Sequence, residues 1–224
     1  MGSGTQTVTR ALVVLDITPS AVQRAAECGA QLIISHHPVI FKPIKTLQQG
    51  SVPYLLAQHG ISAICAHTNL DKAQGGVNDC LAAVLELTEC TPFGAEQPPL
   101  GRMGKLRQTV TPQEFAEKVA KTLGVSVRWN HSGKPVSTVA VVGGAGGSYL
   151  YEAAAAGADA LVTGEVHHHE YLDAAALGIT VIDATHYATE QVVLQPLAEY
   201  LKDAVPQVEF LTFSGGDVLC FTQK

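Results

Sequence analysis

Long apolar runs are missing from this sequence, and so are long basic runs. Its 224 residues are 46% hydrophobic, yet no stretch approaches the roughly 18–20 apolar residues that a membrane-spanning helix needs. Charged residues make up only 15%, and 14 Lys and Arg stand against 20 Asp and Glu. A broad contact with a phosphate backbone requires an excess of basic side chains. We therefore expect a soluble globular protein whose partners include neither a membrane nor a nucleic acid.

Paired cysteines are missing as well. The five cysteines stand at irregular spacings, with no C-x-x-C pair among them. An odd number without a framework indicates reduced thiols rather than disulfides or a thiolate metal site. The first residues, Met1-Gly2-Ser3-Gly4, show neither the basic region nor the apolar core of a signal peptide. These features predict a cytoplasmic protein.

Strand-like and helix-like segments alternate along the chain, and part of the pattern occurs twice. Residues 25–35 resemble residues 153–163, and residues 59–66 resemble residues 177–184. Each copy reads as β-α-β followed by α-β, which favours a parallel sheet with covering helices. We predict an α/β protein of two related lobes with mostly parallel sheets, over residues 1–97 and 98–224, each carrying half of one functional site.

The segments around the repeat give local predictions. Turn signals occur at residues 92–94, 98–99 and 101–104. A capping box at Thr111 predicts a helix that runs to Leu123, and Asn78 is a good N-cap for a helix over residues 79–87. The C-terminal residues 208–213 and 218–221, separated by two glycines, read as a hairpin.

Histidine is abundant and clustered. Six of the nine histidines fall in three places, which are His36-His37, residues 167–169 and His186. Each place lies near the carboxyl end of a predicted strand, where ligands bind in parallel sheets. Successive side chains on a strand diverge, so two adjacent imidazoles suit two neighbouring metal ions better than one.

Carboxylates accompany these histidines. His186 and Glu190 are four residues apart, so they could share a metal ion if that segment is helical. Asp71, four residues after His67, offers the hard oxygen ligand that divalent cations need, although the surrounding residues also read as a turn. The triple histidine at residues 167–169 either contributes one or two members to the site or is a solvated helix start.

The glycine-rich residues 143–148 follow a predicted strand and precede a predicted helix. Tyr149 stands where G-x-G-x-x-G requires glycine, and no Walker lysine follows. A tight turn and a backbone nest for an anion both remain open for this loop.

Four segments together resemble the Nif-three-like dinuclear-metal-centre family, whose members are known as type 2 GTP cyclohydrolase I homologues. The segments are residues 33–38, residues 66–71 with 75–79, residues 163–165 and residues 186–190. The resemblance implies two α/β domains, a toroidal homohexamer and a metal-ligand set in which Glu190 bridges two ions. That implied set is His36, His37, Asp71, His186 and Glu190.

The family also carries a further segment before the first strand, with an aspartate-asparagine-glycine stretch. We expect a misassigned start, a truncation or a loss of that segment in this lineage. The large inserted domain of some relatives is not expected, because residues 91–137 are too few to hold it.

The resemblance and the residues lead to a dinuclear metal hydrolase acting on a nucleotide or another phosphoester. Imidazole and carboxylate ligands suit zinc, iron or manganese, and two such ions activate water for attack. Glu165 or His169 would transfer protons, with Tyr187 as a possible donor. The alternative is a metal-binding scaffold, reservoir or regulatory oligomer without catalysis. A nucleotide-binding module built on the glycine-rich loop is a third hypothesis.

Overall fold

The computed structural model describes residues 1–220, which divide into two compact units. Unit 1 comprises residues 1–70 and 194–216, and unit 2 comprises residues 71–193 with the few residues that follow 216. This division differs from the expected boundary between residues 97 and 98. Residues of the segment 71–97 pack into a core of unit 2, and residues 211 and 213 pack into the core of unit 1.

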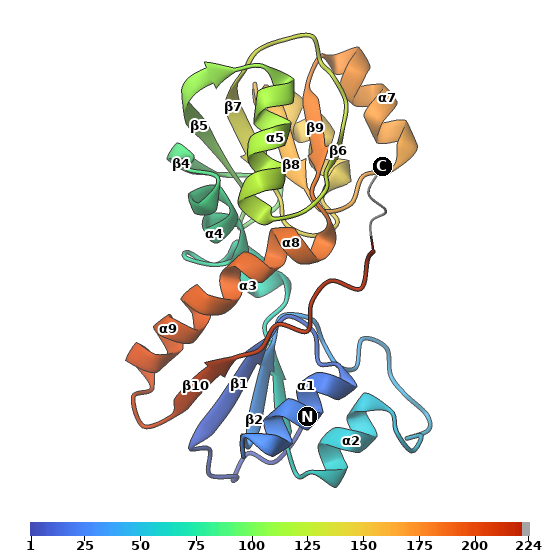
Figure 1. Ribbon diagram of the computed structural model, residues 1–224, viewed down its shortest axis with the longest axis vertical. Helices are drawn as coiled ribbons and strands as arrows, with labels where there is room; N and C mark the ends of the chain where they lie inside the picture. The colour runs from blue at the N-terminus through green and yellow to red at the C-terminus, as the bar shows by residue number, and fades with distance from the viewer. Residues whose placement is uncertain (221–224) are drawn as a thin grey trace. The chain divides into compact units, whose positions relative to one another are not determined.

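Unit 1 contains a four-stranded sheet in which all neighbouring strands are parallel. Its order is β10 (Glu209–Thr212), β1 (Arg10–Val14), β2 (Leu32–Ser35) and β3 (Ser62–Cys65), and Figure 1 shows β10, β1 and β2 side by side. The predicted C-terminal hairpin is therefore wrong, because β10 pairs with the open edge of β1. Residues 213–220 contain no strand, and Phe221 lies outside the described residues.

Three helices cover this sheet, namely α1 (Pro19–Glu27), α2 (Val52–Gln58) and α9 (Leu194–Ala204). Helix α1 starts where Thr18 Oγ1 accepts a hydrogen bond from the Ala21 amide at 3.1 Å, and Gly29 follows its end at φ +69°. Side chains of α1 and α2 pack on one face of the strands. Helix α9 contacts β1 and β10.

Unit 2 repeats the same supersecondary pattern. Its central strands β7 (Val136–Val141), β8 (Ala160–Thr163) and β9 (Thr180–Asp183) are parallel. Turn η1 (Gly147–Tyr149) with α6 (Leu150–Ala155) and then α7 (His168–Leu177) connect them, as α1 and α2 connect β1, β2 and β3. The prediction of two related α/β lobes is confirmed.

Three antiparallel strands extend the sheet of unit 2 to the order β4-β5-β7-β8-β9-β6. These are β4 (Thr88–Phe93), β5 (Gly101–Val110) and β6 (Arg128–Trp129). The turn predicted at residues 101–104 is wrong, because both glycines lie in β5. A β-carbon on Gly101 would come within 2.6 Å of Phe93, and one on Gly104 within 2.7 Å of Cys90, so close packing explains both glycines.

Helices cover both faces of this sheet. Side chains of α4 (Val77–Val84) and α5 (Pro112–Leu123) pack on one face with Val139 and Val141, while α6 and α7 pack on the other with Ala140 and Val142. This alternation is the period of two of a strand buried on both sides. Helix α5 has the predicted capping box at Thr111 and ends at Leu123, with Gly124 as its C-cap.

Three short elements complete the described chain. They are α3 (Thr68–Lys72), which crosses the division between the units, α8 (His186–Glu190) and the turn η2 (Gln191–Val193). Among the helices of residues 1–220, none has the length and apolar character needed to cross a membrane.

Candidate functional site

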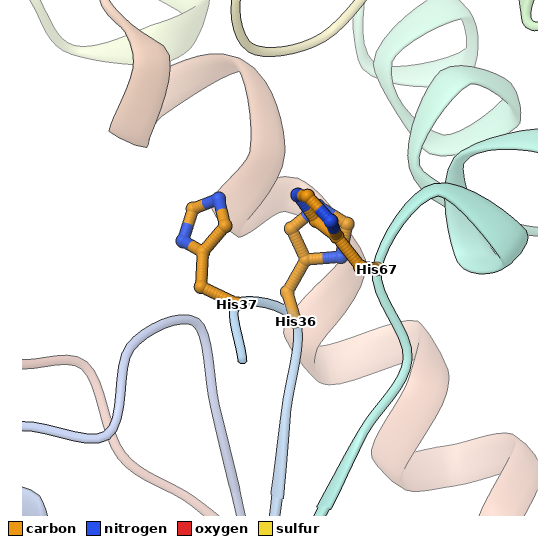
Figure 2. A group of neighbouring side chains, drawn as sticks. All are labelled: His36, His37 and His67. Carbon is orange, nitrogen blue, oxygen red and sulfur yellow. The ribbon is translucent and has the colours of Figure 1, made fainter. Parts of the chain in front are cut away.

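Three histidines of unit 1 lie at the carboxyl ends of two adjacent strands. His36 and His37 directly follow β2, and His67 follows β3 by two residues; the register pairs Ser35 with Cys65, so both strands end level. The ring centroids are 4.9 Å apart for His36 and His37, 5.3 Å for His36 and His67, and 5.5 Å for His37 and His67. Figure 2 shows the three rings projecting from the ends of these neighbouring segments.

Hydrogen bonds fix which ring nitrogen of His36 and of His37 carries a proton. His36 Nδ1 lies 2.9 Å from the carbonyl oxygen of Ala66, and His37 Nδ1 lies 2.8 Å from Oδ1 of Asp16. A carbonyl oxygen and a carboxylate only accept, so Nδ1 donates in both cases and Nε2 is the nitrogen that could bind a metal. Metal-binding histidines in proteins are oriented in this way.

The histidine cluster includes one residue outside the implied ligand set. The ring planes of His36 and His37 are inclined by 54° at a centroid distance of 4.9 Å. His67 is not among the ligands that the resemblance implies, and it joins the cluster. One ring nitrogen from each of the three lies within 4.8 Å of the others, and such a set of neutral imidazoles fits zinc or another divalent transition metal.

Unit 2 holds a second group, in which an imidazole lies between two carboxylates. His186 starts α8, its Nδ1 lies 2.6 Å from Oε1 of Glu165, and its Nε2 lies 3.2 Å from Oε1 of Glu190. Glu165 follows β8, whereas Glu190 ends α8 and is only 3% exposed. The predicted pairing of residues 186 and 190 on one helical turn is present.

Both carboxylates affect the protonation of His186. The hydrogen bond and the charge of Glu190, together with those of Glu165, raise the pKa of His186 to about 9, against the opposing effect of burial. Without a metal, His186 therefore carries a proton between its two carboxylate neighbours at neutral pH. A bound cation would take the place of that proton, because a ligating imidazole must be neutral.

Two glycines leave room beside His186 and Glu190. A β-carbon on Gly144 would collide with Oε1 of Glu190 and lie 3.1 Å from Nε2 of His186, and one on Gly164 would lie 2.5 Å from the Cα of His186. Gly144 is also at φ +66°, which favours glycine. The bare backbone at Gly144 thus faces the same atoms of His186 and Glu190 that would bind a metal.

Asp71 lies near the end of α3 and is half-buried. Its backbone carbonyl accepts a hydrogen bond from Nδ2 of Asn78 at 3.2 Å. Burial and a hydrogen bond to Glu96 raise the pKa of Tyr149, and the negative charge of Asp71 adds a smaller effect in the same direction. The segment that carries Asp71 is therefore held by its backbone.

The two residues expected to transfer protons lie in different surroundings. Glu165 is exposed and bonded to His186. His169 is exposed on α7, where its ring stacks on His167 at 5.7 Å with an angle of 10° between the planes. Tyr187 is half-buried on α8. The structure thus brings Glu165, but not His169, to His186.

The glycine-rich loop uses its amides within the protein. The amide of Gly143 donates to Asn78 Oδ1 at 2.8 Å, that of Gly144 to Thr189 Oγ1 at 3.0 Å, and that of Gly146 to Thr163 Oγ1 at 2.9 Å. An anion nest needs such amides to point at the ligand. The arrangement favours the tight turn over the nucleotide-binding loop.

Two supporting residues were not identified from the sequence. Asp16 orients His37, and Asp183 accepts a hydrogen bond from the Thr185 amide at 3.2 Å while pairing with Arg128. Both contacts depend on the fold, since Asp16 follows β1 and Arg128 belongs to β6. Only a carboxylate at the end of a predicted strand could have indicated them.

Comparison with known families matches residues 1–215 to Duf34/NIF3 (NGG1p interacting factor 3). Proteins named GTP cyclohydrolase 1 type 2 homolog are similar. The protein of Streptococcus pneumoniae is 35% identical over 192 residues, covering 80% of this chain and 72% of its own. That of Streptomyces coelicolor is 34% identical over 205 residues, covering 85% and 72%.

Solved structures are similar throughout the chain. A hypothetical protein of Staphylococcus aureus has a TM-score of 0.90 at 29% identity, covering 99% of this chain and 90% of that one. Reduced HcgD from Methanocaldococcus jannaschii has a TM-score of 0.80 at 29% identity, covering 95% and 86%.

Proposed function

We propose, from the premise that this chain belongs to the Duf34/NIF3 family, that it is a metal-dependent hydrolase of a nucleotide or another phosphoester. In this proposal two divalent ions are bound through His36, His37, Asp71, His186 and Glu190. The observation that carries it is the orientation of the donors in each unit. The histidines at 36 and 37 have Nδ1 engaged by an acceptor, and His186 lies between two carboxylates.

The donor set supports particular metals. Imidazole with carboxylate suits zinc, iron or manganese. Cys65, the last residue of β3, donates its thiol to the His36 carbonyl at 3.1 Å. Bound divalent ions supply Lewis-acid activation of a substrate oxygen and of water. The protein's own contribution is to hold the imidazoles of His36 and His37 in one tautomer.

Glu165 has the best-supported role in proton transfer. It holds the Nδ1 proton of His186, and about half of its side chain is solvent-exposed. Glu165 can therefore orient His186 and exchange a proton at the open edge of the site. His169 was the other candidate, and its stacking on His167 supports a surface role instead.

The proposal is tested with the full-length protein loaded separately with zinc, iron and manganese. Each form is assayed with GTP, because the similar proteins carry its name, and with other nucleotides and simple phosphoesters. Asp71→Asn and Glu190→Gln should abolish turnover and lower the metal content. Matched controls are Asp203→Asn and Glu117→Gln, which neutralise exposed carboxylates on α9 and α5.

The outcomes separate the two functional classes. Stoichiometric metal without turnover on any substrate would contradict the hydrolase and support the metal-binding scaffold, reservoir or regulatory oligomer. A freshly purified protein that contains no metal and takes none up would contradict both. Turnover that survives metal removal would point to another site.

Self-association and location complete the proposal. We infer a homohexamer, which the family resemblance implies. Exposed apolar side chains support self-association, since Ile64 is 56% exposed and Tyr200 is 69% exposed. Sedimentation velocity should give six times the mass of the chain. The cytoplasm is the proposed compartment, because the five cysteines are free.

A further inference from the structure

Asn78 lies in a motif whose role differs from the one expected. The sequence predicts it as the N-cap of a helix over residues 79–87, but α4 begins two residues earlier, at Val77, with Gly76 at the N-cap and no side-chain cap bond. Asn78 is thus inside the first turn, where asparagine is a poor helix former. Its side chain is 1% exposed, so another contact must explain its position.

The Asn78 amide makes three hydrogen bonds to the backbone of three separate segments of unit 2. Nδ2 donates to the carbonyl of Asp71 at 3.2 Å and to that of Leu100 at 2.9 Å, while Oδ1 accepts from the amide of Gly143 at 2.8 Å. Two carbonyls and one amide fix the orientation of the side chain. Only an uncharged amide offers two donors and an acceptor at this size.

Two of these segments lead to proposed metal ligands. Asp71 is itself one of them. Gly143 lies against Glu190, since a β-carbon built on Gly143 would be 3.4 Å from the Cγ of Glu190, and the adjacent Gly144 amide donates to Thr189. Asn78 therefore connects the backbone that carries one carboxylate with the loop that contacts the other.

Neighbouring side chains hold the rest of the segment. Nη2 of Arg102 donates to the carbonyls of Lys72 at 3.2 Å and Ala73 at 3.3 Å, and Oδ2 of Asp79 accepts from the Gly75 amide at 2.6 Å. Because residues 72–75 are fastened separately, loss of Asn78 should release Asp71 without unfolding the whole segment.

We propose that Asn78 is a positioning residue that sets the carboxylates of Asp71 and Glu190 for metal binding. The inference rests on the proposed metal role of these two residues. Asn78 thereby contributes to metal affinity, whereas a residue that only starts a helix contributes to the stability of α4 alone.

The test compares Asn78→Asp with Asn130→Asp in the full-length protein. Aspartate has the same shape as asparagine, but when ionised it donates no hydrogen bond, so N78D faces two carbonyls with an acceptor. Asn130 is a matched control in the same unit, because its Nδ2 donates to Ile179 at 3.0 Å and its Oδ1 accepts from Val181 at 2.7 Å, at the β6 edge of the sheet.

Zinc affinity is measured by competition with a chromophoric chelator at 25 °C, and the visible spectrum is recorded with cobalt. We expect N78D to bind zinc about 10–100-fold more weakly and to change the cobalt spectrum, while N130D keeps both properties although both variants melt earlier. Unchanged affinity and spectrum in N78D would overturn the inference, and so would an equal loss in N130D.

A folding failure leaves the inference testable. If N78D is unfolded by circular dichroism, Asn78→Ser and Asn130→Ser replace the pair, because serine is too short to bridge the segments but adds no charge. If the unmutated protein binds no metal, the proposed function fails. If it binds metal and the Asn78 variants bind equally well, only the role of Asn78 fails.

Discussion

Thr185 has a backbone conformation that is rare outside glycine. Its φ is +65° and its ψ 148°, and it directly precedes His186. Its amide donates to Asp183, its hydroxyl accepts from the Ala188 amide at 3.3 Å, and its carbonyl accepts from Thr189 Oγ1 at 2.9 Å. Such contacts hold a strained residue in place. The φ and ψ of Thr185 set the direction in which the chain continues from β9 to His186.

The strain at Thr185 can be measured against a second threonine N-cap, Thr111, whose φ is −72°. Alanine at either position removes the cap and should lower the free energy of unfolding by about 0.5–2 kcal/mol. Replacing alanine by glycine should restore more stability at position 185 than at position 111, because only at position 185 must alanine adopt a positive φ, at a cost of about 1–3 kcal/mol. Urea unfolding of T185A, T185G, T111A and T111G gives both differences. Equal glycine–alanine differences at the two positions would contradict the strain.

Asp16 offers a prediction about a residue that contacts a histidine but is not itself a proposed ligand. Oδ1 of Asp16 accepts a hydrogen bond from Nδ1 of His37 at 2.8 Å. Asp16→Asn keeps the shape but weakens the acceptor, so metal affinity should fall about 10-fold while the melting temperature stays close to that of the unmutated protein, since the side chain is about half exposed. Isothermal titration with zinc measures the change. Asp203→Asn is the control, and a loss of affinity in both variants would count against this role.

The capping box of α5 gives a pH dependence at the scale of one element. Hydrogen bonds from the amide and hydroxyl of Thr111 lower the pKa of Glu114. A carboxyl whose folded pKa is depressed contributes stability above its unfolded pKa, and loses that contribution as the pH falls through the folded pKa. Glu114→Gln should therefore be less stable than the unmutated protein at pH 7, and the difference should shrink with acidification.

Urea unfolding at a series of pH values between neutral and acidic measures this difference. Glu117→Gln is the control, because it removes a carboxylate from the same helix without touching the cap. A gap between E114Q and the unmutated protein that stays constant with pH would contradict the assignment.

Helix α5 and strand β5 show how far the elements follow from sequence. The limits of α5 are set by local chemistry, a threonine cap with proline after it and glycine at the end, and the sequence predicts them correctly. Strand β5 was mistaken for a turn because Gly101 and Gly104 look like loop residues. Their need for close approach to Phe93 and Cys90 becomes visible only when β4 is in place.

The candidate site likewise contains some residues that local sequence predicts and others that only the fold brings together. His36, His37 and His186 can be placed from sequence, because an apolar strand ending in histidine predicts where a side chain lies in a parallel sheet. His67 as a member of the cluster, and Asp16 and Asn78 as its supports, could not be predicted. Their contacts join residues that are distant along the chain.

At the scale of the whole molecule, each unit has its own core. Leu12 is fully buried in unit 1 and Leu161 in unit 2. Replacing either by alanine should lower the free energy of unfolding of its own unit by about 2–5 kcal/mol. Hydrogen–deuterium exchange with mass spectrometry should then show faster exchange over residues 1–70 and 194–216 in L12A, and over residues 71–193 in L161A. Equal acceleration over all residues in either variant would indicate one cooperative core.

The return of residues 194–216 to unit 1 has a consequence for the protein as it leaves the ribosome. Strand β1 emerges early, but its partner β10 emerges only after the whole of residues 71–193 has been made. At a synthesis rate of about 5–20 residues per second, the delay between the synthesis of β1 and that of β10 is roughly 10–40 seconds. During that interval β1 is an unpaired edge strand of the unit 1 sheet, and unpaired edge strands can pair with strands of other chains. Chains released before residue 209 would keep that edge exposed and would be the forms most prone to aggregate or to be degraded.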